Sequence, residues 1–124
     1  MALMFAYAAA SLLHYAHNAE FLAEYPNMPA WLSRSTVYAA WIGVTAMGAI
    51  GYFIFRRGYR LAGLGVIAVY AALGFDGLGH YGLAPFSAHT AATHVTIWLE
   101  AATAGLVLIA AAWIAAKHLR SSPA

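Results

Sequence analysis

The chain has 124 residues, of which 64% are hydrophobic and only 8% are charged, and it contains no cysteine. So little polar surface cannot coat a water-soluble globule, and the missing cysteine excludes disulfides, thiolate metal ligands and iron–sulfur clusters. The net charge of +2 comes from basic residues near the ends of apolar segments, where membrane topology explains them, so no nucleic-acid partner is expected.

Four apolar segments follow one another along the chain, each near the twenty residues that an α-helix needs to cross a bilayer. We expect helices over about residues 2–24, 36–55, 60–79 and 88–116, joined by short loops. Strand-like alternation is absent, so the prediction is an all-α membrane protein with one four-helix transmembrane domain over residues 1–124. The lipid bilayer is the expected partner, and a homo-oligomer or a larger membrane complex would extend so small a bundle.

The first segment carries ionisable side chains toward its end. His14, His17 and Glu20 fall within an arc of about 120° on a helical wheel, so they can face one site. Pro26 and Pro29 follow and are expected to end the helix, because proline cannot donate the backbone hydrogen bond that a helix requires.

The second segment is expected to be capped by Ser35 or Thr36 and to end in a basic turn. Most of the basic residues fall on one side of the predicted bundle: Arg56, Arg57, Arg60, Lys117 and Arg120, against Arg34 alone on the other side. Basic loops stay in the cytoplasm. Both termini are therefore expected to be cytoplasmic, in a bacterial inner (plasma) membrane, with the opposite loops facing the periplasm or exterior.

The third and fourth segments add polar residues at the same predicted outer end. Asp76 and His80 are four positions apart, which would stack them on one helix face, and His89 and His94 open the fourth segment. Glu100 is the deepest acid. Its wheel angle differs from that of His94 by about 120°, so we expect it to pair with Thr96, Thr103 or Tyr70, or to orient a ligand.

An ionisable group costs about 2.5–3.5 kcal/mol in a bilayer centre, so several in one leaflet need a cation, water or one another. Imidazoles and carboxylates suit zinc, iron or copper. We therefore predict a metal site near the outer face, with Glu20 and Asp76 as catalytic proton carriers in redox chemistry or metal-assisted hydrolysis. Its predicted metal ligands are His14, His17, Asp76, His80, His89 and His94.

Two alternatives stay open at this point. Two histidines from different helices could be the axial ligands of a haem b, which makes the protein a b-type cytochrome. A different class is an accessory subunit or small transporter whose polar cluster carries protons or metal ions.

Overall fold

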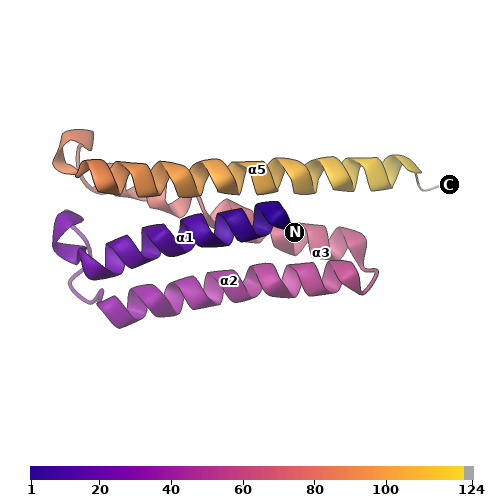
Figure 1. Ribbon diagram of the computed structural model, residues 1–124, viewed down its shortest axis with the longest axis horizontal. Coiled ribbons are helices and arrows are strands. Elements are labelled where there is room, and N and C mark those ends of the chain that lie inside the picture. The colour runs from indigo at the N-terminus through magenta and orange to yellow at the C-terminus, as the bar shows by residue number, and fades with distance from the viewer. Residues whose placement is uncertain (122–124) are drawn as a thin grey trace.

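The computed structural model describes residues 1–121, of which 83% are helical and none lies in a strand. The main helices are α1 (Ala2–Glu20), α2 (Arg34–Arg56), α3 (Arg60–Leu73) and α5 (Ala91–Ser121). They run alternately up and down, so that both ends of the described chain point toward the same end of the bundle (Figure 1). We call this the inner end, and the end that carries the α1–α2 loop the outer end.

The first two helices have boundaries that differ from the predicted ones. Helix α1 stops at Glu20 instead of residue 24, because Phe21 leaves the helical region at φ −121° and ψ 41° and the short 3-10 helix η1 (Leu22–Glu24) follows. Helix α2 is capped by Ser33, not by Ser35 or Thr36. The Ser33 side chain accepts from the backbone N–H of Thr36, whose side chain accepts in return from the Ser33 backbone.

The third segment is not one continuous helix. After α3 ends at Leu73, the 3-10 helix η2 (Asp76–Gly79) leads into the single turn α4 (His80–Leu83). The break lies at Gly74, where a Cβ atom would lie 2.5 Å from Oη of Tyr7 and 2.6 Å from Cβ of Ala104. Asp76 and His80 therefore do not lie on one continuous α-helix as predicted, although both line the same pocket, where Asp76 is exposed and His80 is buried.

The last helix begins later and ends later than the predicted range of 88–116. Residues Phe86–Ala88 form the 3-10 helix η3, and α5 starts at Ala91, so His89 lies in the connection and not in the helix. The buried apolar core fills the inner half of the bundle, and its members come from α1, α3 and α5: Tyr7, Leu64, Ile67, Tyr70, Ala71, Ala104, Val107 and Ala111.

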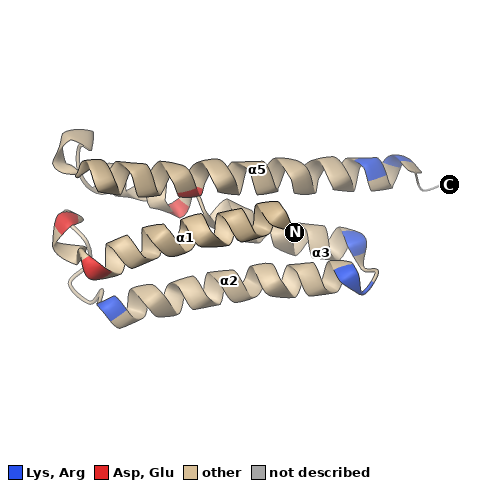
Figure 2. Ribbon diagram, in the orientation of Figure 1, with Lys and Arg blue, Asp and Glu red and all other residues tan. Residues whose placement is uncertain are grey.

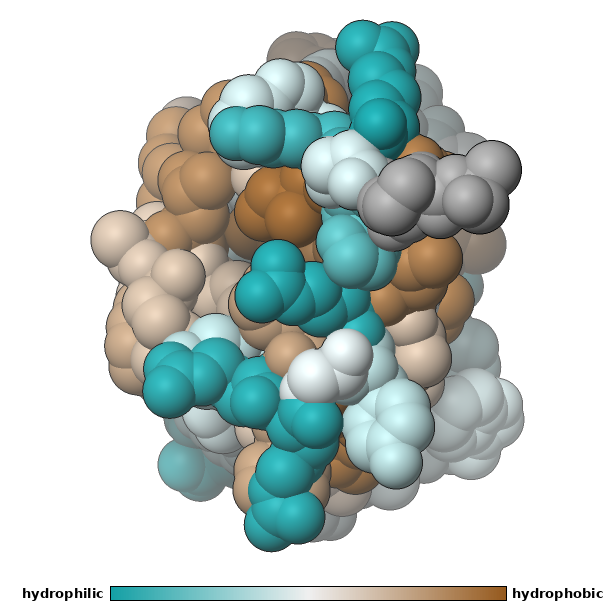
Figure 3. Space-filling model, turned by 90° about the vertical axis from the view of Figure 1, so that its right-hand side faces the viewer, coloured by the Kyte–Doolittle hydropathy of each residue, from teal (hydrophilic) through white to brown (hydrophobic). Residues whose placement is uncertain are grey.

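The surface of the bundle fits a bilayer. Three stretches are long and apolar enough to cross a membrane: Arg34–Arg56, Arg60–Leu83 and Ala91–Ser121. Large apolar side chains such as Ile42, Ile109 and Trp113 point outward from them. Lys and Arg gather at the α2–α3 turn and the end of α5, and hydrophilic side chains cross that end between apolar flanks (Figures 2 and 3).

Candidate functional site

A pocket of about 220 Å³ lies in the outer half of the bundle, where α1, the start of α2, η2, α4 and α5 meet. One part of its wall is polar and the other apolar. The polar residues include His14, Asn18, Asp76, His80 and Glu100, and the apolar wall includes Met28, Trp31, Leu32, Val37 and Ala40. His14 precedes the end of α1 at Glu20 by six positions, which is about 9 Å along the helix axis. The pocket therefore lies below the outer end, within the apolar part of the bundle.

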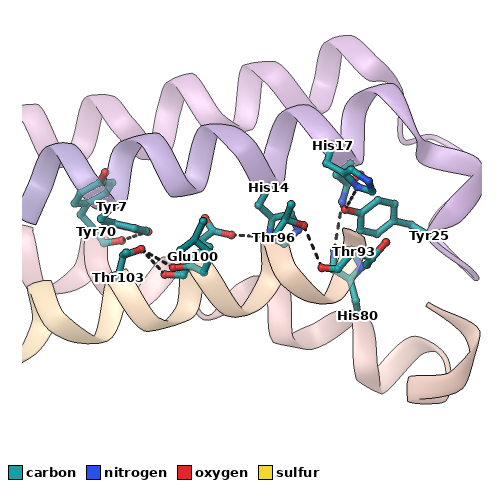
Figure 4. Close-up of polar contacts among 12 residues, drawn as sticks. Tyr7, His14, His17, Tyr25, Tyr70, His80, Thr93, Thr96, Glu100 and Thr103 are labelled. Carbon is teal, nitrogen blue, oxygen red and sulfur yellow. Dashed lines mark hydrogen bonds and ion pairs between the residues drawn. The ribbon is translucent and has the colours of Figure 1, made fainter. Parts of the chain in front are cut away.

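His14 and Glu100 form the most deeply buried polar contact in the pocket. Nδ1 of His14 lies 2.7 Å from Oε2 of Glu100, and the two residues are only 3% and 2% exposed. Figure 4 shows the two side chains meeting between α1 and α5. The ring N–H is not aimed well enough for a hydrogen bond, so this is a close contact of the two side chains. Because Nδ1 faces the carboxylate, Nε2 is the nitrogen that a neutral ring would offer to a ligand.

Gly77 makes room for this contact. A Cβ atom at position 77 would lie 2.4 Å from Cε1 of His14, closer than side chains approach one another. The 3-10 turn of η2 therefore passes directly beside the imidazole, and only glycine allows the ring to lie there.

His80 faces His14 across the pocket, with ring centroids 5.6 Å apart. Nδ2 of Asn18 donates to Nε2 of His80 at 3.2 Å, while Oδ1 of Asn18 has no partner among residues 1–121. The amide can turn over within this contact, so that Oδ1 accepts the Nε2 proton of His80. Nδ1 of His80 then presents a lone pair.

Asp76 brings a negative charge to the same pocket. It lines the wall near His14 and is exposed, and no hydrogen bond or ion pair joins it to another residue in the part of the chain that the structure describes. A carboxylate at this depth calls for water, a proton or a cation.

The remaining predicted residues have partners closer to the outer surface. Burial raises the pKa of Tyr25, so its hydroxyl stays protonated and donates to Nδ1 of His17 at 2.8 Å. Glu20 is exposed and pairs with Arg34 at 2.8 Å, which places it outside the pocket.

His94 and His89 lie together at the start of α5. Nδ1 of His94 forms a 2.8 Å hydrogen bond with the Tyr81 hydroxyl, and its ring stacks on Phe86 with centroids 3.7 Å apart. His89 is buried, and its ring centroid is 6.5 Å from that of His80. Neither residue lines the pocket.

The structure thus brings His14, Asp76 and His80 to one pocket and leaves His17, His89, His94 and Glu20 outside it. As they stand, no three His, Asp or Glu side chains within residues 1–121 are grouped so that they could hold a metal ion. The six-residue ligand set stays a prediction.

Glu100 has a partner that the sequence did not predict. The sequence offers Thr96, Thr103, Tyr70 or a ligand-orienting role, and in the structure the carboxylate meets His14 of α1. Thr103 donates to the Glu100 backbone carbonyl and not to its carboxylate. The signal that pointed to a partner was depth, because a carboxylate far from both helix ends needs one.

Comparison of the chain with models of protein families, with curated proteins and with solved structures gave no match.

Proposed function

We propose that this is a four-span membrane protein that binds one zinc, iron or copper ion in the outer pocket, through His14, His80 and Asp76. Helix α1 has 19 residues, about 28 Å, which suits it as the fourth span. The observation that carries the proposal is the 2.7 Å contact between Glu100 and His14, in a pocket shared with His80 and Asp76.

A carboxylate on the far nitrogen of an imidazole is the arrangement that metal-binding histidines use, because it fixes the ring and makes the other nitrogen more basic. Glu100 is such a neighbour for His14, and the side-chain amide of Asn18 contacts Nε2 of His80. Their ring separation of 5.6 Å is close to the roughly 5 Å of two imidazoles on one tetrahedral ion. To act together as three ligands, the His80 and Asp76 side chains would have to rotate toward His14, because the three are not grouped around one point in the described chain.

A bound ion would also balance the charge in the pocket. Asp76 and Glu100 bring two carboxylates below the outer end, and a divalent cation compensates charge there more fully than one histidine proton. Three protein ligands leave a coordination position open, as in catalytic metal sites, where the ion supplies Lewis-acid chemistry or, for iron and copper, redox chemistry. We also propose that the outer end of the bundle, with this pocket, faces the periplasm or exterior.

The dimensions of the pocket favour an ion over a porphyrin. Its volume of about 220 Å³ is below the range of about 300–1,000 Å³ that drug-sized ligands occupy, and a haem is at least as large as such ligands. The apolar core on the inner side of the pocket favours a fixed site over a continuous path across the bilayer.

The test is metal content and affinity of the purified, untagged protein in detergent, measured by elemental analysis and by titration calorimetry with Zn²⁺. We expect one ion per chain, lost in His14→Ala and in His80→Ala. Glu100→Gln keeps the ion but weakens binding by about 10–100-fold, as loss of an orienting carboxylate does. His118→Ala, at the inner end, serves as the control and binds as the parent protein does.

Two results would overturn the proposal. One is a parent protein that holds far less than one ion per chain at saturating Zn²⁺. The other is equal binding by the parent, His14→Ala and His80→Ala. An absorption spectrum of the same sample tests the haem alternative. A Soret band would show that the protein binds haem and would replace the metal-ion proposal.

A further inference from the structure

His89 is the one histidine in the described chain whose two ring nitrogens are both buried without a hydrogen-bond partner. It is 8% exposed and lies in the connection between η3 and α5. A neutral imidazole carries one donor and one acceptor, and leaving both unpaired in a buried place costs free energy that proteins normally avoid. A ligand on this ring removes that cost.

The groups around His89 are suited to a cation. The His80 ring is 6.5 Å away and the His94 ring 6.0 Å away, centroid to centroid, while the Tyr81 ring stands edge-on at 5.4 Å. Two imidazoles that share an ion at about 2.0–2.1 Å from each nitrogen have centroids about 6 Å apart when the bridge is nearly straight. The separation of His80 and His89 is close to that value.

The position of His89 along the bundle suggests what such an ion does. His80 belongs to the pocket, whereas His89 lies between His80 and His94, at the outer start of α5. The next residue, Thr90, is exposed and donates to Glu24 at 3.2 Å, which puts a half-buried carboxylate at the outer start of α5. A cation taken up at the outer end would therefore reach these side chains in the order Glu24, His89 and His80.

We propose that His89 and His80 form a second, outer position for a transition-metal ion, through which the ion reaches the pocket; this rests on the proposed function of that pocket. His80 takes part in both positions. The outer position has only two imidazole ligands, whereas the pocket has three ligands and Glu100 beside one of them. The outer position therefore binds the ion more weakly than the pocket does and passes it inward.

His89 then affects the rates at which the ion enters and leaves the pocket, and not the affinity of the pocket. Removing it closes the route but leaves His14, His80 and Asp76 in place, so the equilibrium affinity of the pocket stays the same. Because affinity is the ratio of the two rates, dissociation must slow by the same factor as association.

The test is stopped-flow mixing of the full-length protein in detergent with Co²⁺, followed by its absorption bands, and release of bound Co²⁺ to excess chelator. We expect His89→Ala to slow both processes at least tenfold, with unchanged stoichiometry and affinity. His17→Ala is the matched control, because His17 also lies near the outer end but does not line the pocket, and its Nδ1 is hydrogen-bonded to Tyr25. His89→Cys restores a ligand and should recover the rates, whereas a purely structural role would not be restored in this way.

The outcomes separate this inference from the proposed function. If the parent protein binds no Co²⁺ or Zn²⁺, the pocket proposal fails and the route fails with it. If the parent binds and His89→Ala loads and releases the ion at the same rates, only the outer position is overturned. Complete loss of binding in His89→Ala would also overturn it, because His89 would then be a ligand of the inner ion.

Discussion

Gly77 controls where the His14 ring lies, because any larger residue would occupy the same space. A Cβ atom there would lie 2.4 Å from Cε1 and 2.9 Å from Nδ1 of His14. We expect Gly77→Ala to push the imidazole away from Glu100 and weaken metal binding by about 10–100-fold, the usual effect of losing an orienting partner. The strain should also lower the free energy of unfolding by about 1–3 kcal/mol. Calorimetric titration with Zn²⁺ and thermal unfolding in detergent measure the two effects.

Gly79 provides the matched control for this change. It lies two positions further along the same 3-10 helix, but a Cβ atom there meets nothing within 4 Å. Gly79→Ala should therefore bind metal and unfold as the parent protein does. Equal Zn²⁺ affinity in Gly77→Ala and Gly79→Ala would show that the His14 ring position is not needed for binding.

At the scale of the elements, α2 and α3 are in close contact at Gly63. A Cβ atom on Gly63 would lie 2.4 Å from the backbone nitrogen of Phe55, which cannot move without bending α2. Apolar helices in a bilayer depend on such close packing, because lipid is as apolar as their side chains. We expect Gly63→Ala to lower the free energy of unfolding by about 1–3 kcal/mol, the usual range for overpacking, measured by thermal or denaturant unfolding in detergent.

Gly65 is on the same helix and faces open space, so that a Cβ atom meets nothing within 4 Å. Gly65→Ala should be neutral or stabilising by up to about 1 kcal/mol, because alanine favours a helix over glycine. If both alanine variants unfold alike, α2 and α3 are not held together at Gly63.

The helices that the sequence predicts are present, but their ends depend on neighbours that a sequence pattern does not reveal. Apolar residues continue past Gly74, so periodicity predicts one helix over 60–79. The break occurs where Tyr7 of α1 and Ala104 of α5 press against the backbone. The cap at Ser33 lies only two residues before the predicted Ser35, and local hydrogen bonds alone decide between them.

For the molecule as a whole, the gathering of polar residues toward one end could be predicted, because membrane-spanning helices of similar length place residues at known depths. The side-chain partners at that end could not be predicted, because they depend on how each helix is rotated about its axis. His17 turns to Tyr25 and His94 to Tyr81, while Glu100 meets His14. Depth was thus readable from the sequence, and the choice of partner was not.

The asymmetry of basic residues between the two ends predicts the orientation of the molecule. The α2–α3 turn and the end of α5 carry most of the Lys and Arg residues, and such ends stay in the cytoplasm (Figure 2). Helix α5 has 31 residues, about 46 Å, so its last turns extend beyond a hydrocarbon core of about 30 Å. Lys117 and Arg120 can therefore reach water at the inner end. We therefore predict that the pocket, at the other end, faces the periplasm or exterior.

Single-cysteine labelling tests this orientation without background, because the chain has no cysteine of its own. Ser87 is exposed in η3 at the outer end, and Ser121 is exposed at the last turn of α5. We expect a membrane-impermeant maleimide to label Ser87→Cys in intact spheroplasts, and Ser121→Cys only after the membrane is permeabilised. Labelling of both after permeabilisation shows that each thiol is accessible. The reverse pattern in intact spheroplasts would place the pocket on the cytoplasmic side and require a cytoplasmic source for its ion.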